Sequence, residues 1–291
     1  MSKYVLIGIA GLVSFMVILV TYLQRTALEP RVLHSNVLLL ESGSSLRDFA
    51  EMIVLISDLE SPMPIMTWVM ITGRSSSLKA GEYKVSTGDS VEDIVTHVVA
   101  GKVLEHSITF PEGFEFRDII NRLDTAKPLF REEGDLSLEL IKQAIGTDHE
   151  VLEGLFFPDT YHYIRSDTPV SILRRANKVL QVKLQDAWSD KDDGLLLKNP
   201  YELLVLASLI EMEAVVAYEK PKISGVFVNR LRKNMRLQTD PTVIYGLGDE
   251  FTGGLTREHL AKDTPYNTYR RNGLPPTPIS CPGWDSLFAA A

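Results

Sequence analysis

The chain of 291 residues has almost no cysteine, and Cys281 is the only one. No internal disulfide can therefore form, and metal sites built on several thiolates are excluded. The six histidines are scattered along the chain, and none has the His-Glu-x-x-His spacing of zinc hydrolases. We therefore expect neither a metal centre nor an organic cofactor.

The sequence also lacks the excess of basic residues that nucleic-acid binding requires. Its 30 lysines and arginines are outnumbered by 38 acidic residues, which gives a formal net charge of -8. This charge disfavours a general nucleic-acid binder, but it leaves neutral or polar polymers open as ligands. Hydrophobic residues make up 45% of the chain and charged residues 23%, so a packed core is feasible. The length suits one sizeable domain or two modest ones.

A long uncharged run, YVLIGIAGLVSFMVILVTYL, occupies residues 4–23. At about 1.5 Å per residue, a helix of this length crosses a hydrocarbon core of roughly 30 Å. A cleaved signal peptide is the alternative, but its apolar region is usually only about 7–15 residues long. We expect a transmembrane anchor. Lys3 favours a cytoplasmic N-terminus of residues 1–3, whereas Arg25 and Arg31 follow on the other side, so charge alone leaves the topology open.

Residues 24–35 are expected to form a linker, after which one pattern occurs three times. Each copy has a β-prone apolar stretch, a glycine turn, and a helical pattern, and the copies begin at Ser42, Thr87 and Glu112. Glycine permits the turn, and a polar cap residue satisfies the first free N–H groups of the helix. We expect residues 36–105 to form a small α+β module. It resembles a LysM-like domain, a fold that often binds cell-wall glycans; a plain structural spacer is the alternative.

The rest of the chain divides by composition into two further regions. Residues 106–195 alternate helical stretches with turns, and Ser171–Trp188 has a clear apolar stripe. The polar segment at residues 190–194 is a plausible boundary. We interpret residues 106–195 as a connecting helical region and residues 196–291 as the last domain. The predicted fold class is α+β behind one N-terminal transmembrane helix.

A buried helix that ends in two glutamates is the first feature that indicates chemistry. Asn199 and Pro200 are suited to its start, and YELLVLASLIEMEA follows from Tyr201 to Ala214, apolar nearly all round. Glu211 and Glu213 stand at its end, where a buried charge costs several kcal/mol unless it is paired. A desolvated carboxyl is suited to donate a proton near neutral pH. Pairing with Arg230, Arg232 or a backbone amide is the alternative, and we favour it for Glu211.

Polar residues gather in the segments that follow this helix. Met235–Gly248 and Thr264–Ser280 are expected to be loop-rich and contain many Tyr, Asn, Asp, Thr and Pro residues. Such side chains provide the hydrogen bonds and flat rings that a sugar-binding groove needs. The candidates for its lining are Asn229, Gln238, Tyr245, Tyr266 and Asn267, although each could equally hold a loop together.

Several motifs in the chain resemble the successive motifs of the YceG-like family. They are LEGLFFPDTY (residues 152–161), ASLIEMEA, SGVFVNRLR, MRLQTDPTVIYGLG, YNTY and GLPPTPIS, and the similarity runs from about residue 36 to the end. The resemblance implies an endolytic peptidoglycan transglycosylase in which Glu213 is the catalytic acid/base. It also implies one helix in the inner membrane, a LysM-like subdomain, and a catalytic domain at residues 196–291 in the periplasm. Cell-wall synthesis proteins are the partners that the resemblance suggests.

The implied reaction cuts the bond between N-acetylmuramic acid and N-acetylglucosamine and leaves 1,6-anhydro ends. One carboxyl suffices, because the substrate supplies the attacking hydroxyl, whereas a hydrolase normally uses two. Asp240 and Asp159 are candidate second carboxyls for a muramidase. The remaining alternative is a non-catalytic glycan-binding or scaffolding relative. For the enzyme, we expect Asp240 to be among the substrate-binding residues and Glu211, Arg230 and Asp159 to be supporting residues.

The sequence departs from the family pattern at several places. Met212 stands where lysine is common, Ala214 where threonine is common, Thr277 in place of a usual glycine, and Cys281 where asparagine is frequent. The ending, DSLFAAA, comes some tens of residues earlier than is usual in the family. We therefore expect a catalytic domain that is short at its C-terminus, which leaves its activity in question.

Overall fold

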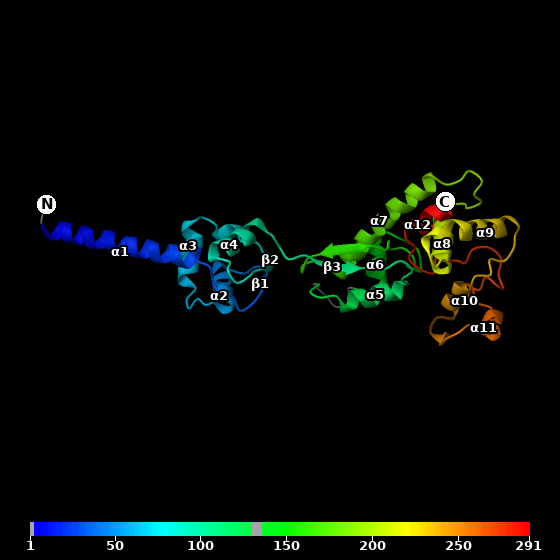
Figure 1. Cartoon of the computed structure of the whole chain (residues 1–291), viewed down its shortest axis with the longest axis horizontal. Helices are drawn as coiled ribbons and strands as arrows, with labels where there is room; N and C mark the ends of the chain where they lie inside the picture. The colour runs from blue at the N-terminus through cyan, green and yellow to red at the C-terminus, as the bar shows by residue number, and fades with distance from the viewer. Residues whose placement is uncertain (1–2, 130–135) are drawn as a thin grey trace. The chain divides into compact units, whose positions relative to one another are not determined.

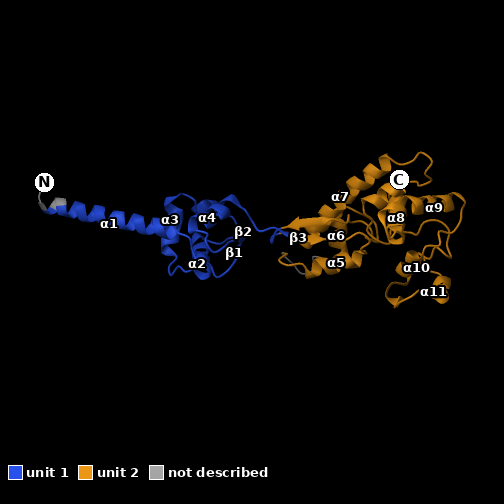
Figure 2. Cartoon of the chain, in the orientation of Figure 1, with its two compact units in different colours: residues 1–106, 164–166 blue, residues 107–163, 167–291 orange. Residues whose placement is uncertain are grey.

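The computed structural model describes residues 3–129 and 136–291 (Figure 1). It divides into two compact units, which Figure 2 colours separately: unit 1 comprises residues 1–106 and 164–166, and unit 2 comprises residues 107–163 and 167–291. Helices and short strands occur in both units, so the predicted α+β class is confirmed.

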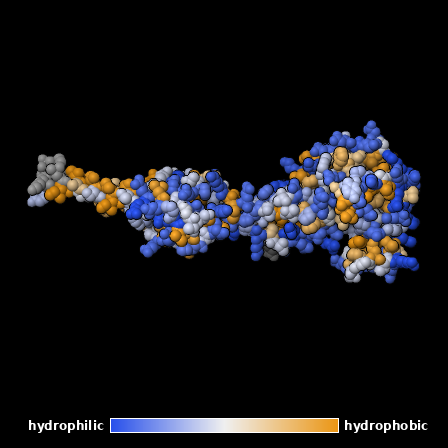
Figure 3. All heavy atoms as spheres, in the orientation of Figure 1, coloured by the Kyte–Doolittle hydropathy of each residue, from blue (hydrophilic) through white to orange (hydrophobic). Residues whose placement is uncertain are grey.

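Helix α1 (Lys3–Leu28) contains the apolar run, and its segment Ile7–Leu28 is long and apolar enough to cross a membrane. Figure 3 shows apolar side chains along it, and most of those that are described are exposed. The helix continues beyond Leu23, where we expected it to end. Leu23 and Ala27 are buried, and α1 packs on α3 and α4 of unit 1. Part of the expected linker is therefore helical and packed.

Unit 1 contains β1 (Val37–Leu40), α2 (Leu46–Ile56), α3 (Met63–Ile71), η1 (Ser75–Ser77), β2 (Gly81–Lys84) and α4 (Val91–Ala100). Strands β1 and β2 pair antiparallel, with Val37 opposite Lys84 and Leu40 opposite Gly81. The helices bury one apolar face each, and their side chains join those of the strands in a single core around Phe49, Ile65 and Tyr83.

The repeated strand–turn–helix pattern is confirmed in all three places. Gly43, Gly88 and Gly113 each have a positive φ, between 78° and 106°, which residues with a Cβ rarely adopt. In the first two copies a serine caps the helix and exchanges hydrogen bonds with an aspartate three residues later. In the third copy Glu115 takes the place of the serine.

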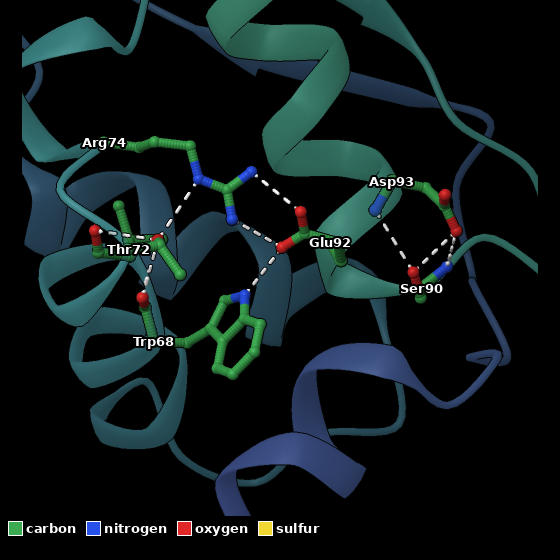
Figure 4. Close-up of polar contacts among 7 residues, drawn as sticks. Trp68, Thr72, Arg74, Ser90, Glu92 and Asp93 are labelled. Atoms are coloured by element: carbon green, nitrogen blue, oxygen red, sulfur yellow. Dashed lines mark hydrogen bonds and ion pairs between the residues drawn. The ribbon is translucent and has the colours of Figure 1, made fainter.

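A polar cluster joins α3 to α4 inside unit 1 (Figure 4). The guanidinium of Arg74 donates to both carboxylate oxygens of Glu92, at 2.8 and 2.5 Å, and Trp68 Nε1 donates to the same carboxylate at 2.7 Å. The hydrogen bonds from Arg74 lower the pKa of Glu92, and partial burial of the carboxyl raises it to a smaller extent. The pKa of Glu92 is therefore lowered overall. Thr72 accepts a further bond from Arg74 Nε. All these groups satisfy one another, so the cluster is structural.

Unit 2 is built around one buried helix. The two strands β3 (His106–Thr109) and β4 (Thr160–Tyr163) form a sheet, and the helices are α5 (Phe116–Thr125), α6 (Leu138–Ile145), α7 (Pro169–Ser189), α8 (Pro200–Glu213), η2 (Ala217–Glu219), α9 (Lys220–Arg232), α10 (Asp240–Leu247), η3 (Gly248–Glu250), α11 (Arg257–Ala261) and α12 (Trp284–Ala290). Every residue of α8 from Leu203 to Ile210 is buried, as its uniformly apolar sequence predicts.

Four helices surround α8: α7, α9, α10 and α12 all pack against it. The segment that leads into α12 also runs beside it, because the N–H of Ile279 donates to Ser208 Oγ at 3.1 Å. One hydrophobic core extends from Ile108 to Ala290. The regions that we expected at residues 106–195 and 196–291 therefore share this core in the described part of the chain.

Candidate active site

The two glutamates at the end of α8 have different environments. Glu213 is the last residue of the helix and is exposed, whereas the Glu211 side chain is only 9% exposed. The expectation of a buried carboxyl at the helix end is therefore wrong for Glu213, whereas Glu211 is covered by Lys220 of α9 and by the start of α12. Met212 and Val215 beside Glu213 are exposed too.

Glu211 is at the centre of a buried ionic network. Lys220 Nζ lies 3.1 Å from both of its carboxylate oxygens, and Lys220 is 5% exposed. The N–H of Gly283 and the hydroxyl of Ser286 donate to Oε2 at 2.9 and 2.7 Å. The predicted pairing of Glu211 is confirmed through this backbone amide, but the cation is Lys220 rather than Arg230 or Arg232. Glu211 thereby joins α8, α9 and the start of α12.

A second acidic side chain, Glu112, approaches the same lysine, with its Oε2 3.6 Å from Lys220 Nζ. Burial and then the nearby charge of Glu211 raise the pKa of Glu112. Two acidic groups therefore share one buried cation, and this part of the helix end is fully paired.

Glu213 is bound from the other side by the segment before α10. The hydroxyl of Thr239 donates to Glu213 Oε2 at 2.6 Å, and Oε1 accepts no hydrogen bond from the described part of the chain. Asp240 follows directly and accepts a 2.6 Å hydrogen bond from the hydroxyl of Tyr269. Burial first, then the hydrogen bond to Asp240, and then the charges of Asp240 and Glu213 raise the pKa of Tyr269 to about 12. These four side chains form one polar cluster at the exposed carboxyl.

Thr239 is fixed by a group of buried hydroxyls. Its N–H donates to Thr268 Oγ1 at 3.1 Å, and its carbonyl accepts from Thr242 Oγ1 at 2.7 Å. The hydroxyls of Thr242 and Thr268 are also 2.8 Å apart. All three threonines are at most 2% exposed, so the donor to Glu213 is held in place from several directions.

The segment after Leu237 contains more helix than we expected. We predicted a loop-rich region at Met235–Gly248, but Asp240–Leu247 forms α10. Pro241 at the first turn is a signal for a helix start that our interpretation did not use. Gln238, just before it, has φ +52°, and its N–H donates to the carbonyl of Thr268. This turn directs Thr239 towards Glu213.

The predicted groove residues fall into two groups. Asn229 and Gln238 are exposed, and no hydrogen bond of either side chain to the described residues is found. Asn267 is fully buried instead, and its side chain bonds the carbonyls of Leu260 and Lys262, so it holds its own loop together.

The tyrosines of the predicted groove are also engaged within the protein. Tyr245 and Tyr266 pack edge to face with their ring centres 4.7 Å apart, and the Tyr266 hydroxyl lies 2.9 Å from Thr277 Oγ1. Thr277, which departs from the family pattern, therefore has a partner in this chain. Arg230, predicted as a supporting residue, donates to the carbonyl of Leu237.

One buried carboxyl was absent from the predicted set. Glu153, in the motif LEGLFFPDTY, is 4% exposed, and the hydroxyl of Tyr245 donates to its Oε2 at 3.2 Å. Burial raises its pKa to about 7. A glutamate among apolar residues in this motif was the signal that could have indicated it. Asp159, at the other end of the motif, is exposed and accepts a bond from the N–H of Thr160.

In residues 3–129 and 136–291, no group of three or more His, Cys, Asp or Glu side chains is placed to hold a metal ion. A cavity of about 580 Å³ lies at the opposite end of α8, lined by residues such as Asn199, Tyr201 and Pro275. The first turn of the 14-residue helix α8 is about 20 Å from Glu213, and Val205, which also lines the cavity, is about 9 Å from Glu211 along the helix.

The exposed Glu213 carboxyl, with one oxygen bonded to a hydroxyl and the other open, has the geometry that general acid/base chemistry on a polar substrate requires. The sequence model of the YceG-like family matches residues 38–291. The chain therefore belongs to the YceG-like family.

Relatives with assigned names agree with this membership. The chain is 29% identical over 269 residues to the endolytic murein transglycosylase of Bacillus subtilis, which covers 86% of the chain and 73% of that protein. It is 28% identical to the endolytic murein transglycosylase of Streptococcus pneumoniae D39, with 73% of the chain and 44% of that protein covered. A crystal structure of a yceG-like protein from Listeria monocytogenes is 29% identical and matches with a TM-score of 0.55, covering 87% of this chain and 88% of that one.

Proposed function

We propose that this chain is an endolytic lytic transglycosylase that cuts the glycan strands of peptidoglycan, with Glu213 as its single acid/base. The observation that carries the proposal is the exposed Glu213 carboxyl, whose Oε2 is fixed by Thr239 while Oε1 is open. The names of the Bacillus and Streptococcus relatives support the substrate class. The open surface around Glu213 suits a polymer that is cut within its length.

In the proposed reaction, Oε1 of protonated Glu213 gives its proton to the glycosidic oxygen between N-acetylmuramic acid and N-acetylglucosamine. The bond from that oxygen to the muramic C1 breaks. The resulting Glu213 carboxylate then takes the proton of the muramic C6 hydroxyl, whose oxygen bonds to C1 and closes the 1,6-anhydro ring. Glu213 ends protonated, as it began, and no water is consumed. The bound glycan covers the exposed carboxyl and supplies the desolvation that the free chain lacks.

We also propose that α1 anchors the enzyme in the inner membrane, with unit 2 and the part of unit 1 that follows α1 in the periplasm, where peptidoglycan lies. The length and apolar surface of α1 support the anchor. Cell-wall synthesis proteins remain the proposed partners. Protease protection of right-side-out and inverted vesicles tests the topology: a tag after Ala291 should be cleaved only when the periplasmic face is exposed.

Unit 1 is proposed to be a LysM-like module that binds the glycan. Its order of one strand, two helices and an antiparallel second strand supports this proposal. A cavity of about 420 Å³ lies between β1 and α2, lined by Leu39, Glu41, Ser42, Gly43, Ser44, Asp48 and Met52. Ser44→Trp should fill it and weaken sedimentation with purified sacculi. Unchanged sedimentation would favour a plain spacer.

The proposed activity is tested by mass spectrometry of muropeptides released from purified peptidoglycan. The unaltered chain should release 1,6-anhydro-muramic products, and Glu213→Gln should release none. Glu139→Gln, which changes an exposed carboxyl on α6, is the matched control and should be active.

Each other outcome supports a different function. Products with reducing ends would indicate a muramidase that uses Glu213 and Asp240. Binding to sacculi without products from any variant would indicate a glycan-binding relative.

A further inference from the structure

Glu153 is a buried carboxyl whose hydrogen bonds come from three different directions. Its Oε1 accepts from the N–H groups of Phe116 and Gly154, at 2.9 and 3.2 Å, and its Oε2 accepts from the hydroxyl of Tyr245 at 3.2 Å. With 4% of its surface exposed, Glu153 lies out of reach of a glycan strand. Any part that it plays in the reaction must pass through its neighbours.

The titratable groups around Glu153 are acidic or neutral. Glu115, which pairs with Arg117, faces it from the start of α5 and opposes its ionisation. Tyr245 faces it from α10, and burial and then the charge of Glu153 raise the pKa of this phenol. Cys281 faces it from the segment before α12. Burial is the main cause that raises the pKa of its thiol, and the charges of Glu153 and, more weakly, Asp118 raise it further.

Glu153 therefore changes its charge in the range where the enzyme would work. Burial is the largest cause that raises its pKa, to about 7, and the hydrogen bonds from Phe116, Tyr245 and Gly154 only partly oppose it. Near neutral pH, both the carboxylate and the protonated carboxyl are populated.

Helix α10 connects this carboxyl to Glu213. Tyr245, near the end of the helix, donates to Glu153, and Thr239, which directly precedes the helix, donates to Glu213. The short helix thus has one glutamate bound at each end. A shift of α10 at Tyr245 would move the donor at Thr239 as well.

A second connection runs through the chain beside α8. Gly154 has φ +72°, and a Cβ there would lie 2.4 Å from Pro278 Cβ. The next residue, Ile279, is bonded to Ser208 in the middle of α8. The Glu153 segment is therefore connected through Pro278 and Ile279 to the same helix that carries Glu213.

We propose that Glu153 is a positioning residue for the reaction at Glu213: its carboxylate anchors Tyr245, and through α10 it keeps Thr239 against the acid/base. This inference rests on the proposed function. The charged carboxylate makes the stronger hydrogen bond to the phenol. When Glu153 is protonated, it can donate to Tyr245 instead, the anchor weakens, and turnover falls.

The test is the pH dependence of kcat and KM for release of anhydro-muropeptides between pH 5.5 and 8.5. The unaltered chain should show a step in kcat near pH 7, on the order of 10-fold, with KM unchanged. Glu153→Gln keeps the shape of the side chain but cannot ionise. Its kcat should therefore show no step and should equal, at every pH, the kcat of the unaltered chain below the step. Glu150→Gln changes an exposed carboxyl nearby and is the matched control, with an unaltered profile.

Tyr245→Phe removes only the hydroxyl and carries the test if Glu153→Gln fails to fold. It should lose the same step and leave KM unchanged, and the double variant should be no slower than either single one. A step near pH 7 that persists in both single variants would overturn the inference. If the unaltered chain releases no anhydro products, the proposed function fails instead, so the two failures are distinguishable.

Discussion

The hydroxyl of Thr239 donates to Glu213 Oε2 across 2.6 Å, which joins the start of α10 to the end of α8. The two residues are far apart in sequence, and each belongs to a different motif of the family. The contact fixes Oε2, while Oε1 accepts no hydrogen bond from the described part of the chain.

Replacing Thr239 with valine should lower kcat with little effect on folding. Valine keeps the shape but removes the donor, and a hydrogen bond to a charged group contributes about 1.5–3 kcal/mol. We expect a loss of roughly 10- to 100-fold in the rate of anhydro-product release. Thr239→Ser retains the hydroxyl and should stay within a few-fold of the unaltered chain. Equal rates for the valine and serine variants would contradict this role.

Removing the Glu211 carboxylate should destabilise unit 2. Glu211→Ala leaves Lys220 buried with only the more distant Glu112, and breaking a buried pair costs about 3–5 kcal/mol. Thermal unfolding followed by circular dichroism would show the lowered midpoint. The double variant Glu211→Leu with Lys220→Met removes both charges and should recover part of the loss. A midpoint that does not change in Glu211→Ala would refute the buried-pair argument.

Glu92 should make unit 1 less stable in acid. Its pKa is lower in the folded chain than in the unfolded one, chiefly through Arg74. The stabilisation is therefore present above the unfolded pKa of about 4.3 and is lost as the pH falls through the lower, folded value. Glu92→Gln should cost about 1 kcal/mol at pH 7 and flatten the loss of stability below pH 4. Urea unfolding at pH 3 and pH 7 measures both effects, with Glu51→Gln as an exposed control.

Glu153 should have the opposite effect on stability. Its folded pKa of about 7 lies above the usual 4.5, so the folded chain binds the proton more tightly. Proton binding by Glu153 stabilises the folded chain by on the order of 3 kcal/mol below the unfolded pKa, and this stabilisation is lost as the pH rises through about 7. The unfolding midpoint of the unaltered chain should therefore fall more between pH 5 and pH 8 than that of Glu153→Gln. Parallel pH curves for the two proteins would contradict the assignment.

Local signals in the sequence were sufficient to predict the helices and turns that contacts between neighbouring residues determine. The apolar run at residues 203–210 and the cap at Asn199 predict a buried helix, and α8 is one. The glycine turns and polar caps likewise predict the strand–turn–helix segments. Helix α10 was missed because the many polar residues around Pro241 outweighed its value as a helix start.

The candidate site depends on contacts that no sequence window contains. Thr239 reaches Glu213, and Tyr269 reaches Asp240, only after the chain folds. The same is true of Glu153 and Tyr245. These partners could not be predicted from spacing in the sequence. Asn267 shows the converse, because its polar side chain suits a groove but bonds the carbonyls of Leu260 and Lys262 in its own loop. The exposure of Glu213 likewise depends on which surrounding elements cover the helix end, and the sequence of α8 does not specify this.

The capped strand–turn–helix segments have a consequence for how the chain folds. Each closes its own helix start with contacts three residues apart, at Ser45, Ser90 and Glu115. Contacts of such short range form before distant segments meet, because little loop entropy opposes them. These three segments should therefore gain protection from hydrogen exchange early in refolding, ahead of the pairing of β1 with β2.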